Sequence, residues 1–201
     1  AARIEVPPAG ADNARWWFEK RAEHARAIGG DAEVERMIQT ELEGIFYEDP
    51  ALWYPVLLDA LKKNGTTASL PILEHWLSLD LRGMPHAGCW KQVRNLRWLA
   101  TEAWYRIRER GCATPAERES LAKLLLTPSF EQVPLYPTVE FAKEVLDPFL
   151  PQSREWVYEV LRSDLPVRES PGCPVTFYLL RDPQYAPTAM ESREIMATGG
   201  E

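Results

Sequence analysis

The sequence predicts an all-α protein made of stacked antiparallel helix pairs, followed by an extended, proline-rich C-terminal segment. Apolar residues recur at helical spacing in one segment after another, and glycines, prolines and capping residues separate these segments. The chain has 201 residues, 45% hydrophobic and 26% charged, so it can bury a core without metal or disulfide support. We expect an N-terminal arm over 1–11, a helical-repeat domain over 12–164 and a C-terminal segment over 165–201 that packs on the helices.

The first two helices are predicted on either side of a glycine pair. Asp12 is a suitable N-cap for a helix over about 13–28, and Gly29 and Gly30 end that helix. Its expected buried face consists of Ala14, Trp17, Phe18, Ala25 and Ile28. Asp31 can cap the second helix, in which these apolar residues recur at helical spacing: Val34, Met37, Ile38, Leu42, Ile45 and Phe46.

The next helices are delimited by proline, threonine and glycine. A third helix is predicted to begin at Asp49-Pro50 and to run through Lys63, and a fourth to begin at Thr66 or Thr67 and to reach about Leu79. Each carries a proline near its first turn, where a missing N–H costs little. A long helix over about 89–110 ends at Gly111, and Thr114-Pro115 begins the helix after it, which reaches about Leu126.

The C-terminal third changes in character. Residues 127–136 are predicted to form a loop, followed by helices over about 137–147 and 152–163, the latter capped by Ser153 or by the preceding turn. Five prolines after Leu165 exclude a continuous helix. The apolar run 175–180 therefore predicts an extended strap on the helical body, with or without a short strand, and the tail after about Thr188 is either a terminal helix or mobile.

A family resemblance rests on the helix pair within residues 66–111. Its first helix contains Leu70-Pro71-Ile72-Leu73, and its second contains Val93-Arg94, Leu99-Ala100, Ala103 and Ile107. This pattern resembles the HEAT-like, armadillo-type helical repeats, although the loop between the two helices is longer than in a typical unit. The resemblance implies an irregular α-solenoid that acts as a binding scaffold. A plain helical bundle is the alternative.

The long helix 89–110 has two contrasting faces on a helical wheel. An aliphatic face holds Val93, Leu96, Ala100, Ala103 and Ile107. The candidate partner-binding residues lie roughly opposite: Lys91, Arg94, Trp98 and Tyr105. Either both faces are buried, as aromatic residues at helical spacing more often are, or the second face is an exposed contact patch of the kind found at interface hot spots. A ligand pocket is a third interpretation.

Local charge suggests a partner for such a patch. Between Arg82 and Arg110 there are seven Lys/Arg and two acidic residues, in a chain of net charge −7. If exposed, this helix would suit an acidic protein surface or an acidic peptide; a solvated face or salt bridges to neighbouring helices is the simpler interpretation. We therefore predict a protein-interaction scaffold or an accessory subunit of a larger complex. The net charge argues against general nucleic-acid binding, which leaves a HEAT-like nucleic-acid-binding protein, such as the HEAT-like DNA glycosylases, as a second alternative.

An enzyme or ligand-binding protein is the first alternative, with a groove near His75, His86 and Cys89. No GxSxG, P-loop, GxGxxG or HExxH motif occurs, so we predict no catalytic residue and no cofactor. The cysteines, which include Cys112 and Cys173, lack the spacing of a zinc site. His86-x-x-Cys89 is half of a metal site, and because its other ligands would have to come from afar we predict no metal.

The sequence does not determine the cellular compartment of the protein. No run of 18 apolar residues exists, so no membrane span is expected. The chain begins with alanine rather than methionine, and small residues there suit the mature side of a signal-peptide cleavage site. The protein is therefore either cytoplasmic or exported.

Overall fold

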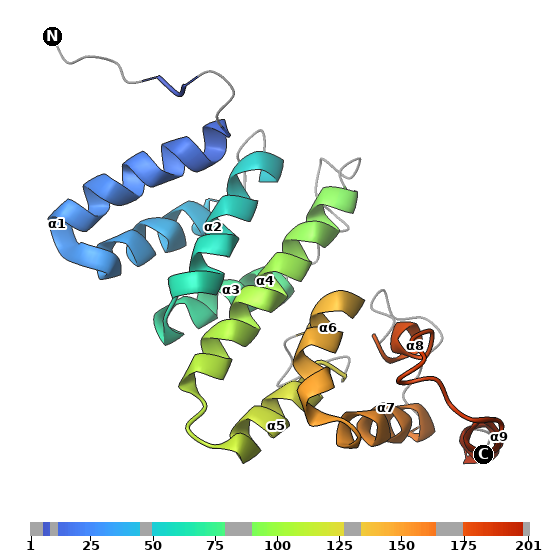
Figure 1. The fold of residues 1–201 in the computed structure, drawn as a ribbon. Coiled ribbons are helices and arrows are strands. Elements are labelled where there is room, and N and C mark those ends of the chain that lie inside the picture. Colours follow the sequence, from blue (N-terminus) through green and yellow to red (C-terminus); the bar gives the residue numbers. More distant parts are fainter. Residues whose placement is uncertain are drawn as a thin grey trace, which may run out of the picture. The chain divides into compact units, whose positions relative to one another are not determined.

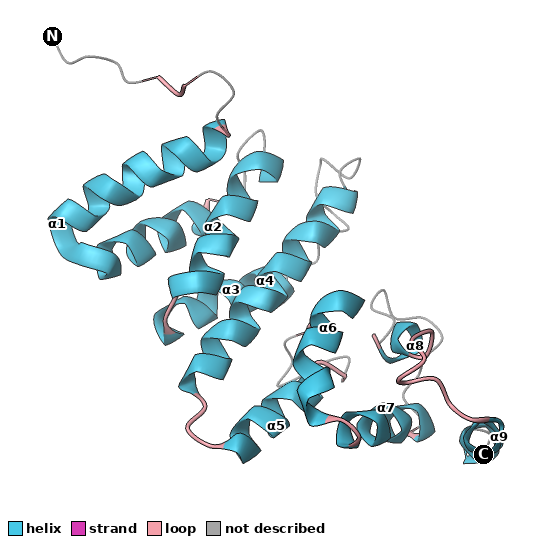
Figure 2. Cartoon of the chain, in the orientation of Figure 1, coloured by secondary structure: helices cyan, strands magenta, loops and turns pink. Residues whose placement is uncertain are grey.

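All regular structure is helical in the part of the chain that the structure describes (Figures 1 and 2). This computed structural model describes residues 6–8, 12–44, 50–78, 90–126, 134–163 and 175–198, with the backbone alone for 50–52, 90–94 and 198. The all-α prediction is thus confirmed. The chain divides into two compact units, residues 1–107 and 108–201, and each is described by itself. The domain bounds expected from the sequence stay a prediction.

The first helix of unit 1, α1 (Asn13–Glu43), is bent back on itself at the predicted glycine pair (Figure 1). Asp12 caps it as expected, by accepting a hydrogen bond from the backbone N–H of Arg15 at 3.1 Å. Gly29 (φ −143°, ψ 19°) and Gly30 (φ 69°, ψ −158°) both leave the helical region. Residues with a β-carbon avoid the positive φ of Gly30, so a glycine is needed at this bend.

Ion pairs join the two segments of α1 across the bend. Arg21 pairs with Glu41, and Arg26 Nε donates to Asp31 Oδ1 at 2.9 Å. Asp31 thus bonds to a side chain of the first segment, where the sequence predicted a helix cap. The second segment buries Val34, Ile38 and Leu42, at the spacing predicted.

The buried face of the first segment of α1 differs from the expected one. Ala22 and Ala25 are 5% and 7% exposed, whereas Trp17 and Ile28 are 45% and 67% exposed. The expectation that Trp17 and Ile28 are buried was therefore wrong. Small side chains allow the helices to approach closely on the alanine side, which leaves the bulky residues on the outer side.

Helices α2 (Pro50–Asn64) and α3 (Leu70–Ser78) continue unit 1, with a 3₁₀ turn (Thr67–Ser69) between them. Thr66 caps this turn by accepting from the N–H of Ala68 at 3.2 Å. Pro55 lies in the second turn of α2, whereas it was expected near the first turn. The core side chains of the two helices are Tyr54, Leu57, Leu58, Leu61, Leu73, Trp76 and Leu77.

Two buried aromatic residues tie α1 to α2 and α3. The rings of Tyr54 and Trp76 meet edge to face with centroids 5.0 Å apart. Tyr54 donates its hydroxyl to the carbonyl of Gly44 at 2.8 Å, and Trp76 donates its indole N–H to the carbonyl of Leu42 at 2.9 Å. These bonds satisfy carbonyls at the C-terminal end of α1, which have no partner within the helix.

Helix α4 (Trp90–Gly111) ends at the predicted glycine, and the boundary between the units falls in its last turn. In unit 2, α5 (Pro115–Leu124) begins with a capping box between Thr114 and Glu117. The remaining elements of unit 2 are α6 (Val139–Leu146), a 3₁₀ turn (Asp147–Phe149), α7 (Gln152–Arg162), α8 (Thr176–Leu179) and α9 (Ala189–Thr198).

The C-terminal segment corrects the sequence prediction. Residues 175–198 form α8, a series of turns and α9, so neither an extended strap nor a strand is present over this range. Prolines 183 and 187 lie in the turns and therefore interrupt neither helix. Val175, Leu179 and Tyr185 are buried, and α8 and α9 contact other helices of unit 2, α8 both α6 and α7 and α9 α7. None of the described helices has the length and apolar character needed to cross a membrane.

Candidate functional site

Helix α4 is largely buried over residues 100–107. The aliphatic face is buried as predicted at Leu96, Ala100, Ala103 and Ile107; the side chain of Val93 is not among those described. Other directions around the helix are also buried: Thr101 is 0% exposed, and Trp104 and Tyr105 are each 1% exposed. Only Glu102 and Arg106 remain half-buried between residues 100 and 107, so this part of the helix belongs mainly to the core.

Polar contacts of α4 also point into unit 1. Trp104 donates its indole N–H to Glu74 Oε1 of α3 at 2.9 Å. Lys62 of α2 pairs with Glu102 at 2.7 Å, and the side chain of Glu102 is only 15% exposed. Neither contact involves a lysine or arginine of α4, so the interpretation of its basic charge stays a prediction.

The four candidate partner-binding residues differ in their exposure and in whether the structure describes their side chains. Tyr105 is in the core and offers no side-chain surface to a partner, so it is a packing residue in this structure. Trp98 is half-buried, beside an exposed Asn95. The side chains of Lys91 and Arg94 lie outside those that the structure describes. A contact surface on α4 is therefore restricted to its first half, and its binding role stays a prediction.

A second aromatic surface, on α1, was missed from the sequence. Trp16 and Trp17 meet edge to face with centroids 4.7 Å apart, and Trp17 is 45% exposed. Phe18 points to the other side of the helix, where its ring lies 6.3 Å from that of Trp53 in α2. Trp16 is half-buried, and the exposure of Trp17 was missed because Trp17 had been placed with Phe18 on the buried face.

Trp53 also fixes the position of Arg21. The Arg21 guanidinium lies 5.8 Å from the centroid of the Trp53 ring, and the same arginine pairs with Glu41. Trp53 in turn donates its indole N–H to Glu41 Oε2 at 3.3 Å. The positive charge of Arg21 is thus compensated by a carboxylate and an aromatic face within unit 1.

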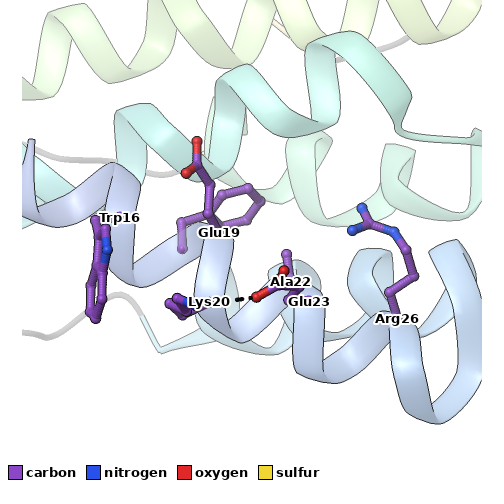
Figure 3. Close-up of a pocket in the computed structure, with 7 residues that line it drawn as sticks. Trp16, Glu19, Lys20, Ala22, Glu23 and Arg26 are labelled. Carbon is purple, nitrogen blue, oxygen red and sulfur yellow. Dashed lines mark hydrogen bonds and ion pairs between the residues drawn. The ribbon is translucent and has the colours of Figure 1, made fainter. Parts of the chain in front are cut away.

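An open hollow lies beside this surface along the first segment of α1 (Figure 3). Trp16, Phe18 and Ala22 supply its apolar lining, and its polar residues are Glu19, Lys20, Glu23 and Arg26. Lys20 pairs with Glu23 at 3.5 Å. The polar residues of this hollow are exposed and of mixed sign.

Unit 2 contains a buried network of polar side chains around Tyr158 and Tyr185. Tyr185 is 0% exposed, and its hydroxyl lies 2.9 Å from Asp147 Oδ1 and 3.4 Å from Ser153 Oγ. Ser153 is therefore a buried partner of Tyr185, and the predicted helix cap is absent, because no side chain caps α7. Burial raises the pKa of Tyr185 to about 12, so its hydroxyl is neutral near pH 7.

Charged residues hold the C-terminal segment on α6 and α7. Arg154 donates through Nε to the Tyr158 hydroxyl at 3.0 Å and through Nη2 to Glu191 Oε2 at 2.8 Å. Lys143 of α6 pairs with Asp182. The hydrogen bond from Lys143 lowers the pKa of Asp182 from its ordinary value, and backbone and side-chain hydrogen bonds from Thr188 lower the pKa of Glu191. These two ion pairs, Arg154–Glu191 and Lys143–Asp182, therefore hold residues 175–198 on α6 and α7.

The structure does not test the enzyme alternative, because it describes only one of its three groups. His75 is exposed on α3, and His86 and Cys89 lie outside the described residues. Cys112 is half-buried and bonds to the carbonyl of Arg108 at 3.5 Å. Within the described ranges, no group of three His, Cys, Asp or Glu side chains could hold a metal ion.

Comparisons with known proteins add no relative. No protein-family model, curated protein or solved structure matches the chain. The class that the fold defines is therefore an all-α protein, and a more specific role has to be argued from its surfaces.

Proposed function

We propose that this protein is a non-enzymatic interaction scaffold, or an accessory subunit of a larger complex, of the HEAT-like helical-repeat type. It binds another protein through the first half of α4. The observation that carries the proposal is the contrast along α4. Between residues 100 and 107 only Glu102 and Arg106 are half-buried and the other residues are buried, whereas over residues 95–99 Leu96 is buried, Asn95 is exposed and Arg97, Trp98 and Leu99 are half-buried. Residues 100–107 fix the helix in the core of unit 1. Residues 95–99 leave part of its surface accessible to a partner.

Trp98 is the central residue of this surface. A partly covered tryptophan on an anchored helix loses little conformational entropy on binding and buries a large apolar area. Lys91 and Arg94 precede it on the same face by sequence. Since Tyr105 is in the core, the contact residues are Lys91, Arg94 and Trp98.

The partner is an acidic protein surface or acidic peptide. Glu102, one of the two acidic residues of α4, pairs with Lys62 and therefore does not offset the charge of Lys91 and Arg94. Opposite charges across an interface raise the association rate and select the partner more than they add affinity. Binding should therefore weaken as salt increases.

The test is affinity purification of the tagged protein, with bound proteins quantified by mass spectrometry. We expect the double variant Arg94→Ala, Trp98→Ala to lose one or more partners that the wild type retains. Arg118→Ala is the matched control, because Arg118 is an exposed arginine of α5. Thermal unfolding must be similar in all three proteins. Equal recovery of every partner by a folded double variant would refute the proposed surface.

A further inference from the structure

The glycine pair divides α1 into a first segment, residues 13–28, and a second segment, residues 31–43, which are seen on either side of the bend in Figure 1. Gly29 and Gly30 both have non-helical φ and ψ, so the cooperativity of helix formation is interrupted between the two segments. A β-carbon at Gly30 would meet no atom within 4 Å, so the backbone has room to move there. The bend has the properties of a hinge, in which a few residues absorb the change in φ and ψ.

The two segments differ in how much apolar surface they bury. Eleven of the sixteen residues 13–28 are exposed, against five of the thirteen residues 31–43. The fully buried side chains of the first segment are those of Ala22 and Ala25. Those of the second segment are larger: Val34, Ile38 and Leu42. Since the free energy of burial rises with the apolar area removed from water, the first segment is held less firmly than the second.

Hydrogen bonds anchor the second segment to elements that follow it. Glu35 accepts from the backbone N–H of Thr66 at 2.8 Å and from the hydroxyl of Ser69. Trp76 of α3 donates its indole N–H to the carbonyl of Leu42 at 2.9 Å. None of these bonds involves residues 13–28, so the second segment keeps them whether or not the first segment stays in place.

The first segment is attached through arginine side chains. Three of its arginines pair with carboxylates outside the segment: Arg15 with Asp59 of α2 at 3.9 Å, Arg21 with Glu41, and Arg26 with Asp31 at 2.9 Å. The side chains of these arginines are 58%, 48% and 55% exposed. Ion pairs as exposed as these contribute little stability and are screened by salt. The attachment of the first segment is therefore easier to release than that of the second.

We propose that the first segment of α1 undocks as one unit by hinging at Gly29 and Gly30, while the second segment stays packed, and that the three arginine pairs hold it closed. A single helix of this length has little stability in water, so its backbone hydrogen bonds are lost in the open state. Opening separates Phe18 from Trp53 of α2, whose rings lie 6.3 Å apart, and thereby exposes this side of α2 further. The proposal is independent of the α4 surface, because it uses a different helix and a different measurement.

The test is residue-resolved hydrogen exchange of the full chain. We expect the backbone amides of residues 17–28 to share one protection factor, at least about tenfold below that of residues 34–42, because local opening needs less free energy than global unfolding. Raising NaCl from about 0.05 M to about 1 M should lower the protection of residues 17–28 about twofold to fivefold. Equal protection of the two segments overturns the proposal. So does protection that declines residue by residue towards Asn13, because this gradient is the mark of fraying from the helix end.

A variant of the second segment separates hinging from unfolding of the whole unit. Glu35→Ala removes bonds that are present in both the closed and the open state. It should therefore lower the protection of residues 34–42 at least about fivefold and leave that of residues 17–28 unchanged. If α1 opened only together with the rest of unit 1, the protection of both segments would fall equally, and the proposal would be wrong.

The role of the arginine pairs is tested by two matched substitutions. Arg21→Gln removes a pair that joins the two segments and should lower the protection of residues 17–28 about twofold to fivefold. Arg36→Gln is the control, because Arg36 pairs with Glu33 inside the second segment and its side chain is 68% exposed. It should leave the protection of residues 17–28 at the wild-type value. Equal effects of the two substitutions on residues 17–28 would show that the arginine pairs do not hold the first segment closed.

Discussion

The indole N–H of Trp104 donates a hydrogen bond of 2.9 Å to Glu74 Oε1 and thereby links α4 to α3 in the core of unit 1. Trp104 is 1% exposed, whereas Glu74 is half-buried. The bond joins residues that are 30 positions apart in the chain. The contacts of α4 therefore cannot be derived from the spacing of its own residues, because polar partners of this helix come from helices that precede it in the chain.

The first prediction concerns this bond. Glu74→Ala leaves the buried Trp104 N–H without its acceptor and should lower the free energy of unfolding by about 1–3 kcal/mol. Urea denaturation followed by tryptophan fluorescence measures the change. Glu43→Ala, at an exposed position of α1, is the control and should change stability by less than about 0.5 kcal/mol. If both variants behave alike, the bond contributes nothing to stability.

The second prediction compares two glycines. Gly30 has φ 69°, and a β-carbon there would meet no atom within 4 Å, so any cost of Gly30→Ala comes from the backbone alone. We expect a loss of about 1–3 kcal/mol, because this φ/ψ combination (φ 69°, ψ −158°) is essentially restricted to glycine. Gly111 ends α4 without a positive φ and also has open space, so Gly111→Ala should be neutral or slightly stabilising. Thermal unfolding of the two variants tests the contrast, and an equal effect would contradict the bend.

Local signals were sufficient for much of the fold. The cap at Asp12, the break at Gly29 and Gly30, and the start of α5 at Thr114 were all predicted, because each depends on residues within one helical turn. These features need no knowledge of tertiary contacts.

Burial was harder to predict, because packing partners decide which apolar face of a helix is covered. Trp17 was expected inside and is exposed, and Tyr105 was a candidate contact residue and is buried. The apolar run 175–180 could pack as a strand or as a helix, and its contacts with α6 and α7 select the helix. Of the candidate residues on α4, Tyr105 is therefore buried and Trp98 is half-buried, and their binding role stays a prediction; the exposure of Trp17 on α1 was not predicted.

The third prediction uses the raised pKa of Tyr185, about 12 in the folded protein. An unfolded tyrosine has a pKa of about 10, so between these values the folded state binds more protons and stability falls as pH rises. The stabilisation is present below pH 10 and is lost through pH 12, on the order of 2–3 kcal/mol. Tyr185→Phe cannot ionise, so its unfolding free energy should decline less over this range.

Urea denaturation between pH 9 and pH 12 compares the two proteins. Below about pH 10 the wild type should be the more stable, because Tyr185→Phe loses the bond to Asp147. Parallel pH profiles for wild type and variant would show that Tyr185 is not protected from solvent.

The fourth prediction concerns the acid side and the ion pair between Lys143 and Asp182. The hydrogen bond from Lys143 lowers the pKa of Asp182, so this carboxylate stabilises the folded state above its unfolded pKa of about 3.9 and ceases to do so as pH falls through its lower folded value. Asp182→Asn removes the charge at every pH. Its urea midpoint should lie below that of the wild type at pH 6, and the difference should shrink steadily below about pH 4. Glu159→Gln, at an exposed position of α7, should follow the wild type throughout. A difference between Asp182→Asn and wild type that stays constant down to pH 2 would mean that the charge of Asp182 does not hold the C-terminal segment.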